Sequence, residues 1–425
     1  MPAGPAAGTG ALPVPPTQET QTLPALTHEE AIRASLGILT SHGLVPEAYF
    51  AATGSMKDAW LLAATHLSEG VVDPRTGRAR TEPGARYEAL FDEISPGSDP
   101  SEFSAALDQL APRSSLYVTL KSALPSTDDA GNASRLQVSL ERLRRLPRDT
   151  GERYLIANIP GYEVIAYDGG AEASRRPAIV GQPGRQTPEF SDSIEHVIFN
   201  PWWDVPASIA IRDKLPQFRR DPGAVGRLGY QIYSRDGERV DAAGIDWNTV
   251  PASPFPYRIR QAPGPANALG QVKFIFPNAY DVYLHDTPEK ALFSRPERAF
   301  SSGCIRVSDP LGLAEWALSG TPGWDAEKIG ATVRAGRESR INLSNPLPIH
   351  IVYLTAFPGP DGEIAFLNDV YGRDGPLLAA MTPFSGTGLA DASLGRPLAA
   401  LDASSINAGQ PKKDTDHGDC LYRSS

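Results

Sequence analysis

One of the two cysteines of this 425-residue chain, Cys304, stands in the stretch SSGCIRV, and His285 precedes it in YLHDTP. A cysteine is an effective nucleophile as the thiolate, and a nearby imidazole can accept the thiol proton. Gly303, directly before the cysteine, allows a sharp turn whose amide groups could line an oxyanion pocket. These residues are candidates for a nucleophile, a general base and an oxyanion hole. Their spacing alone also fits a structural thiol near an unrelated histidine.

Two neighbouring side chains are candidate substrate contacts. Tyr283 alternates with His285 on an expected strand, so both share one face. Arg306 shares a face with Cys304 in the same way, and a cation there favours the thiolate and could bind a substrate carboxylate. The alternative interpretation is a core aromatic for Tyr283 and a surface cation for Arg306.

The elements that must position these residues fall into two regions. Helical periodicity begins at Thr27, where Glu30 completes a capping box, and Gly43 follows as a stop signal. From residue 153 the apolar period switches to two, with a hairpin signal at Pro160–Gly161. We therefore predict an α+β protein in which a small N-terminal helical scaffold precedes a mainly β domain.

Composition divides the chain further. The N-terminal stretch is rich in Pro, Ala and Gly without periodicity, and the C-terminal stretch is polar and holds the second cysteine, Cys420. One polar, Gly/Pro-punctuated segment inside the β region is predicted to be an insertion that caps the domain. The predicted units are a disordered arm at 1–27, the scaffold at 28–150, the β domain at 151–375 with its capping insertion at 204–262, and a disordered tail at 384–425.

Several classes of function are disfavoured. The net charge is −10 and no Lys/Arg block stands out, which argues against nucleic acid as a partner. The seven histidines show no shared ligand spacing and no phosphate-binding loop is present, so we expect no metal and no cofactor. No apolar run is long enough for a membrane span. A disulfide between Cys304 and Cys420 is poorly motivated.

A set of ordered strings resembles the L,D-transpeptidase catalytic domain of the YkuD family, and within it the larger, YcbB-like branch. The strings are IANIPGYEV, GQPGRQTPEF, NPWWDVP, NALGQVKF, YLHDTP, SSGCIRV and FLNDVYGRDG. The stretches HGLVPEAYF, LSEGVVDPRTG and LERLRRLP also resemble the N-terminal scaffold of that branch. Many strings in one order are far more specific than a single Cys–His spacing.

The resemblance implies roles for individual residues. Cys304 would attack meso-diaminopimelate of a donor tetrapeptide stem, His285 would act as general base, and backbone amides near Gly303 would form the oxyanion hole. The orienting partner of His285 would be a backbone carbonyl, because Asp286 points to the opposite strand face. The implied substrate-binding residues are Tyr283, Arg306, Ser302, Trp203, Asn267 and Lys273. For the last three, the alternatives are core packing, turn geometry and a surface cation, respectively.

The implied function is a cysteine L,D-transpeptidase that cross-links peptidoglycan stem peptides, with partners in cell-wall synthesis, a role in cell shape and sensitivity to carbapenems. Two features depart from the family pattern: Ser302 stands where many family members have His, and the peptidoglycan-binding module usual in large relatives does not separate scaffold from catalytic domain. Both incline the prediction from a 3–3 link towards a 1–3 link to L-Ala of the acceptor stem, although the sequence does not show the acceptor.

Two rival functions remain open: a carboxypeptidase or endopeptidase that uses water as the acceptor, and a non-catalytic wall-binding scaffold. The first 27 residues lack the basic and apolar segments of a secretory signal. The implied substrate nevertheless lies outside the inner membrane. We therefore expect a periplasmic protein whose signal peptide or N-terminal anchor is not visible in this chain.

Overall fold

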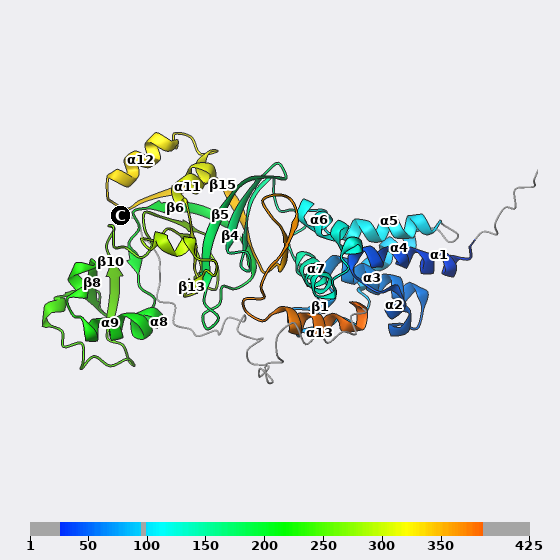
Figure 1. The fold of residues 1–425 in the computed structure, drawn as a ribbon, viewed down its shortest axis with the longest axis horizontal. Coiled ribbons are helices and arrows are strands. Elements are labelled where there is room, and N and C mark those ends of the chain that lie inside the picture. Colours follow the sequence, from blue (N-terminus) through cyan, green and yellow to red (C-terminus); the bar gives the residue numbers. More distant parts are fainter. Residues whose placement is uncertain (1–25, 95–98, 386–425) are drawn as a thin grey trace, which may run out of the picture.

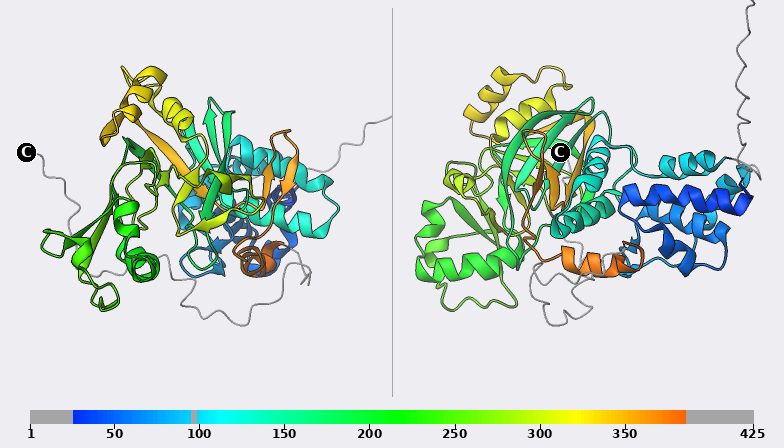
Figure 2. Two further views of the ribbon diagram at one scale, coloured as in Figure 1. Left: turned by 60° about the vertical axis from the view of Figure 1, so that its left-hand side comes forward. Right: turned by 45° about the vertical axis from the view of Figure 1, so that its right-hand side comes forward.

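The computed structural model describes residues 26–94 and 99–385. A helical unit, a β domain and a cap follow one another along the long axis of the molecule (Figure 1, Figure 2). The predicted helical region followed by a mainly β domain is therefore confirmed.

The α-helices are α1 His28–Ser35, α2 Pro46–Ala52, α3 Met56–Glu69, α4 Glu88–Glu93, α5 Pro100–Leu110, α6 Ser115–Ala123, α7 Ala130–Leu143, α8 Ala207–Ile209, α9 Leu215–Arg220, α10 Ala224–Arg227, α11 Pro310–Leu318, α12 Ala326–Arg334 and α13 Asp374–Ser385. Shorter 3₁₀ turns are η1 Leu36–His42, η2 Ala85–Tyr87, η3 Leu124–Ser126, η5 Ala242–Gly244 and η6 Lys290–Ser294, and η4 Ala210–Lys214 is a π turn.

The strands are β1 Val72–Asp73, β2 Arg78–Ala79, β3 Arg153–Asn158, β4 Glu163–Asp168, β5 Ala171–Gly181, β6 Phe190–Phe199, β7 Trp203–Asp204, β8 Tyr230–Ser234, β9 Arg239–Val240, β10 Tyr257–Gln261, β11 Val272–Ile275, β12 Leu284–His285, β13 Ala299–Ser301, β14 Ile305–Val307, β15 Ser339–Val352, β16 Ala356–Pro358 and β17 Ile364–Phe366.

Local sequence signals set the ends of the first helix. The predicted capping box is confirmed, because Thr27 Oγ1 accepts the Glu30 N–H and the Glu30 carboxylate accepts the Thr27 N–H at 2.8 Å. The helix continues as the 3₁₀ turn η1. Gly43 then ends it with a φ of 75°, a left-handed conformation that costs glycine little.

The helical unit and the β domain share one hydrophobic core. Buried helical residues such as Trp60 and Leu140 belong to the same cluster as Tyr154 and Ile156 on the outer face of β3. These two β3 residues alternate with Leu155, which faces the second cluster inside the β domain. The switch from helices to strands near residue 150 is therefore a change of secondary structure, because both regions pack on one hydrophobic core.

The C-terminal helix α13 fastens the β domain to the helical unit (Figure 1). At its start, Asp374 forms a buried ion pair with Arg142 of α7 at 2.6 Å. At its end, Phe384 is 1% exposed and packs against the rings of Tyr49 and His66. Residues 384 and 385, predicted to belong to the tail, instead form the buried end of this helix. Cys420 and the rest of the tail, like arm residues 1–25, lie outside the described residues.

The β domain is a closed sheet. A nine-stranded sheet runs in the order β13-β5-β14-β12-β11-β6-β15-β3-β4, and β4 pairs back with β5. Closure removes most free strand edges and leaves β13 as an extra strand beside β5. The predicted hairpin at Pro160–Gly161 is confirmed by the antiparallel pairing of β3 and β4.

The cap has a core of its own. A four-stranded sheet, β7-β10-β8-β9, packs with α9 and α10, and Phe218, Trp247 and Ile232 are 0–1% exposed. The segment 204–262, predicted from its polar composition to be a capping insertion, therefore also has a packed hydrophobic core that its composition did not indicate. Its aromatic residues are widely spaced in the sequence and meet only when the strands pair.

Candidate active site

Strand register brings Cys304 and His285 to the same face of the sheet. β12 and β14 are parallel neighbours, in which Leu284 pairs with Ile305 and His285 with Arg306. Leu284 and Ile305 are 0% exposed in the core of the barrel. Because strand side chains alternate, His285, Arg306 and the cysteine just before β14 face outward, where the cap covers them.

A hydrogen-bonded loop holds the cysteine at the end of β13. Gly303 has a φ of 117°, which favours glycine over any residue with a side chain. Its carbonyl accepts a hydrogen bond from Thr187 Oγ1 at 2.8 Å, and its N–H donates to Ser301 Oγ at 3.1 Å. Ser301 Oγ donates in turn to the Cys304 carbonyl at 2.5 Å. The predicted oxyanion amide of Gly303 is thus engaged within its own loop.

His285 is held as a neutral base. Its Nδ1 lies 2.5 Å from the backbone carbonyl oxygen of Asp286, which can only accept, so Nδ1 carries the hydrogen and Nε2 keeps a lone pair. Burial, followed by the positive charges of Arg306 and Lys273, lowers the pKa of His285 to about 3. The prediction of a backbone carbonyl as orienting partner is confirmed. The Asp286 carboxylate instead accepts hydrogen bonds from backbone amides.

Cys304 is a neutral thiol in this site. Its Sγ donates to the carbonyl of Asp281 at 3.7 Å. Burial raises the pKa of the thiol to about 11, although hydrogen bonds with Tyr283 and the charge of Arg306 oppose the rise. The resting pair is therefore thiol and imidazole. Proton transfer to His285 requires the thiol to leave the Asp281 carbonyl and to lose its proton as it attacks.

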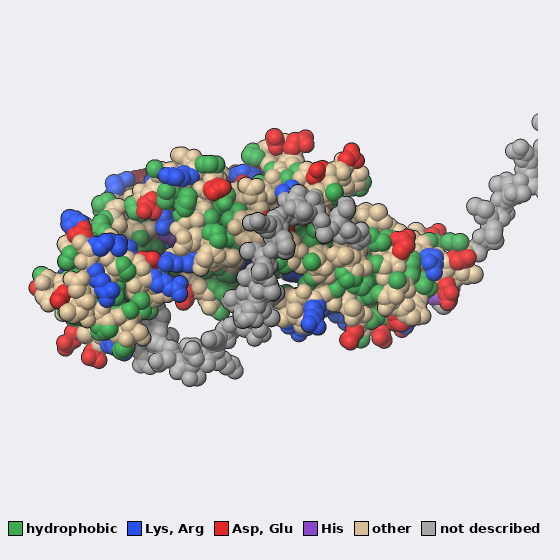
Figure 3. Space-filling model, turned by 60° about the horizontal axis from the view of Figure 1, so that its bottom comes forward, with side chains coloured by type: hydrophobic (Ala, Val, Ile, Leu, Met, Phe, Trp, Pro, Cys, Tyr) green, Lys and Arg blue, Asp and Glu red, His purple; other side chains and the backbone are tan. Residues whose placement is uncertain are grey.

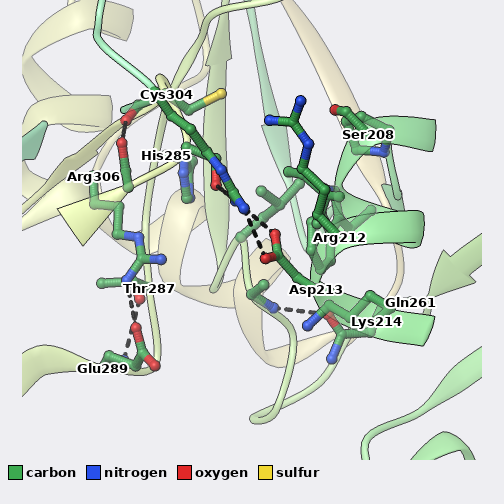
Figure 4. A pocket seen from close by; sticks show the side chains of 18 of the residues that line it. Ser208, Arg212, Asp213, Lys214, Gln261, His285, Thr287, Glu289, Cys304 and Arg306 are labelled. Atoms are coloured by element: carbon green, nitrogen blue, oxygen red, sulfur yellow. Dashed lines mark hydrogen bonds and ion pairs between the residues drawn. The ribbon is translucent and has the colours of Figure 1, made fainter. Parts of the chain in front are cut away.

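A cavity of about 680 Å³ lies over this face, between the barrel and the cap. Figure 4 shows Cys304 and His285 on its barrel side and Ser208 and Arg212 on its cap side. Lys and Arg side chains gather at the cap end of the molecule in Figure 3. The cavity therefore lies between the barrel face that carries the candidate nucleophile and base and a cap that carries cationic side chains.

Four of the six predicted substrate contacts line this cavity: Tyr283, Ser302, Arg306 and Trp203. Arg306 forms an ion pair with Glu289 of the loop after β12. Trp203 is 7% exposed and shares the cap core, so its predicted alternative role in packing also applies.

The structure does not bring Asn267 and Lys273 into the cavity lining. Asn267 is 1% exposed, and its amide donates to the carbonyls of Pro201, Gln261 and Ala262 at 2.9–3.3 Å. Its role is the predicted alternative, turn geometry. The Lys273 Nζ lies 5.5 Å from the centroid of the Tyr283 ring. Lys273 therefore lies behind Tyr283, and its positive charge acts on the site from outside the cavity lining.

Sequence reasoning missed a link between the cap and the nucleophile loop. The Arg185 guanidinium donates to both carboxylate oxygens of Asp213 in the cap, at 2.7 and 2.9 Å, and to Ser302 Oγ at 2.8 Å. Arg185 lies inside the family-like string GQPGRQTPEF, so a signal for it existed. Asp213 lies in the predicted capping insertion, and only the folded cap reveals its role.

Two further searches concern the described residues, 26–94 and 99–385. No group of three or more His, Cys, Asp or Glu side chains there could hold a metal ion. No helix within these ranges is long and apolar enough to cross a membrane.

Residues 152–324, which contain His285, Cys304 and the whole cap, match the family model described as the YkuD L,D-transpeptidase catalytic domain. This segment is similar to the catalytic domain of the YkuD family. The matched segment begins at the first strand of the barrel and includes the strands and loops that carry the candidate nucleophile and base.

The known proteins similar to this chain fall into two groups. A candidate L,D-transpeptidase of Haemophilus influenzae is 34% identical over 251 residues, which is 59% of this chain and 50% of that protein. The chain thus spans about half the length of this curated relative.

Solved structures show weaker similarity. An L,D-transpeptidase from Mycobacterium smegmatis is 14% identical, with a TM-score of 0.22 over 47% of this chain and 58% of that chain. L,D-transpeptidase 3 from Mycobacterium tuberculosis is 15% identical, with a TM-score of 0.23 over 47% and 61%. At such TM-scores neither superposition bears on the site of this domain.

Proposed function

We propose that this protein is a cysteine L,D-transpeptidase that cross-links peptidoglycan stem peptides. The observation that carries the proposal is the pairing of β12 with β14, which sets His285 and Cys304 on one face beneath a capped cavity. The family of the domain supports an acyltransferase acting on peptidoglycan.

The proposed reaction has two steps. In the first, Cys304 Sγ attacks the carbonyl at the L-centre of meso-diaminopimelate in a donor tetrapeptide, while His285 Nε2 takes the thiol proton. The C–N bond to the terminal D-Ala breaks, that proton leaves with the D-Ala amine, and a thioester forms. In the second, an acceptor amine attacks the thioester, His285 takes a proton from this amine, and the thiol is restored by that proton.

The tetrahedral intermediates need an oxyanion partner. The amide of Cys304 is one donor on the nucleophile loop. The Gly303 amide becomes the second donor only if it leaves Ser301 Oγ, which it contacts at 3.1 Å. The loop would therefore tighten around the substrate, as catalytic hydrogen bonds often do on complex formation.

The acceptor and the compartment belong to the same proposal. The acceptor amine is either that of a second diaminopimelate, giving a 3–3 link, or that of L-Ala at the head of the acceptor stem, giving a 1–3 link. We favour the 1–3 link because Ser302 replaces the usual His and because no wall-binding module lies between the scaffold and the catalytic domain. Because intact stem peptides lie outside the inner membrane, we assign the protein to the periplasm.

Purified disaccharide-tetrapeptide muropeptides test the proposal directly. Incubation with the protein should yield dimers, and tandem mass spectrometry of the cross-link distinguishes 3–3 from 1–3. Cys304→Ala should abolish the dimers, whereas Cys420→Ser, in the tail, should leave them unchanged. Shortened monomers without dimers would instead indicate a hydrolase.

A second readout is independent of the acceptor. Incubation with a carbapenem should add the mass of one inhibitor to the intact protein and none to Cys304→Ala, since acylation needs only the first step. Cross-linking by Cys304→Ala at the wild-type rate would refute the proposal. If neither turnover nor acylation is observed, the non-catalytic scaffold is the better interpretation.

A further inference from the structure

Three consecutive residues of the cap, Arg212, Asp213 and Lys214, line the catalytic cavity. On an α-helix, successive side chains turn by about 100°, so three in a row do not share a face. Here they lie in the π turn η4, between α8 and α9, which widens the helix. Pro216 favours this widening because it has no N–H for the carbonyl of Arg212 and its ring crowds that carbonyl.

Two of these three side chains already have partners. Asp213 is held by both terminal nitrogens of Arg185. The Lys214 Nζ lies over the rings of Trp203 and Tyr230, 5.3 and 5.2 Å from their centroids. No hydrogen bond or ion pair joins Arg212 to any residue within 26–94 or 99–385. Figure 4 shows its guanidinium directed into the cavity, across from Cys304.

The other guanidinium groups of the cavity are neutralised locally. Arg185 pairs with Asp213, and Arg306 pairs with Glu289. Arg212 is thus the cavity guanidinium whose charge is not matched by a carboxylate among the described residues. A planar fork of N–H donors without a partner is suited to bind a carboxylate in two parallel hydrogen bonds.

We propose that Arg212 determines donor specificity by binding a free carboxylate of the stem peptide that acylates Cys304. This inference rests on the proposed transpeptidase function and names one contact within it. The free carboxylates of the donor nearest the scissile bond are those at its terminal D-Ala and on the side chain of diaminopimelate. Both share one chemistry, and amidation of either group removes the charge without changing the scissile bond.

The test uses three tetrapeptide donors: unmodified, amidated at the terminal D-Ala, and amidated on the diaminopimelate side chain. The release of the terminal residue, D-Ala or, from the second donor, D-Ala amide, gives kcat and KM for the wild type, Arg212→Gln and Arg220→Gln. Arg220 is a matched control because it is exposed on α9, the continuation of the same helix, and does not line the cavity. Thermal unfolding checks that each variant is folded.

The wild type and Arg220→Gln should turn over one amidated donor with a kcat/KM about 10- to 100-fold lower than the unmodified donor, as expected for a charge-assisted contact. Arg212→Gln should lose this discrimination, mainly through a raised KM for the unmodified donor. The rejected donor identifies the carboxylate. Undiminished discrimination by Arg212→Gln, or its absence in the wild type, would overturn the inference.

Binding separates this inference from the proposed function. Titration calorimetry of the same donors into Cys304→Ala protein, with and without Arg212→Gln, measures recognition without chemistry. If no donor is turned over but binding shows the predicted discrimination, the transpeptidase proposal fails while carboxylate recognition stands. If turnover occurs and the binding of the donors does not depend on Arg212, carboxylate recognition by Arg212 fails while the transpeptidase proposal stands.

Discussion

The pKa values of the site make a sharp prediction about the reactivity of Cys304. At pH 7.5 an ordinary thiol with a pKa near 8.5 is about 10% thiolate, whereas a pKa of about 11 leaves about 0.03%. A thiolate of higher pKa is intrinsically more nucleophilic, by about tenfold for this difference. Cys304 should therefore react with iodoacetamide about 20 to 30 times more slowly than a free cysteine.

The assay follows alkylation by intact-protein mass spectrometry in a Cys420→Ser background, so that Cys304 is the one remaining cysteine. The logarithm of the rate should rise linearly with pH from about 6 to 10, without a plateau, because the thiol titrates above this range. In Arg306→Gln the slope should persist and the rate should fall, since the loss of the cation raises the pKa of the thiol further.

Carbapenem acylation should behave differently from alkylation. With the pKa of His285 near 3, the neutral imidazole is present throughout the pH range 5 to 9. Acylation assisted by His285 should therefore be nearly independent of pH there. A plateau of alkylation with an apparent pKa below 8, or a fall in acylation around pH 6 to 7, would indicate a thiolate–imidazolium pair and refute the neutral-pair reasoning.

Three other perturbations follow from the described contacts. Arg185→Ala should lower kcat/KM about tenfold but stability by only about 1 kcal/mol, because it removes a partly exposed pair between cap and nucleophile loop; the exchange of Arg185 and Asp213 should restore part of the loss. His66 is buried with its pKa lowered to about 4, so protonation favours the unfolded chain. The free energy of unfolding measured in urea should therefore fall by about 2–3 kcal/mol from pH 6.5 to 4.5 because of His66. His66→Gln should make the free energy of unfolding less dependent on pH over this range. Asn267→Ala should lower stability by about 1–3 kcal/mol, with the donor KM within about twofold of wild type, because it leaves carbonyls without a donor and removes no cavity contact; a large KM change would restore Asn267 as a substrate contact.

Local sequence signals were sufficient to predict those features of the fold whose physical cause is itself local. Thr27 and Glu30 specify the first helix end because their hydrogen bonds span a single turn. Asp309 and Pro310 start α11 for the same reason. The alternation of Tyr283 and His285 likewise needed only the geometry of a strand. By contrast, the core of the cap was missed because Phe218 and Trp247 are far apart in the sequence.

The sequence by itself determined the chemistry available to this protein: a nucleophilic cysteine after a glycine, a histidine on a strand, and the order of family-like strings around them. Only the tertiary structure decided the protonation states of the cysteine and the histidine and which residues lie opposite them. Burial beneath the cap makes the Cys304–His285 pair neutral, and the π turn that precedes Pro216 sets Arg212 opposite the nucleophile. Desolvation and charge pairing depend on groups that are distant in the chain, so no local pattern encodes them.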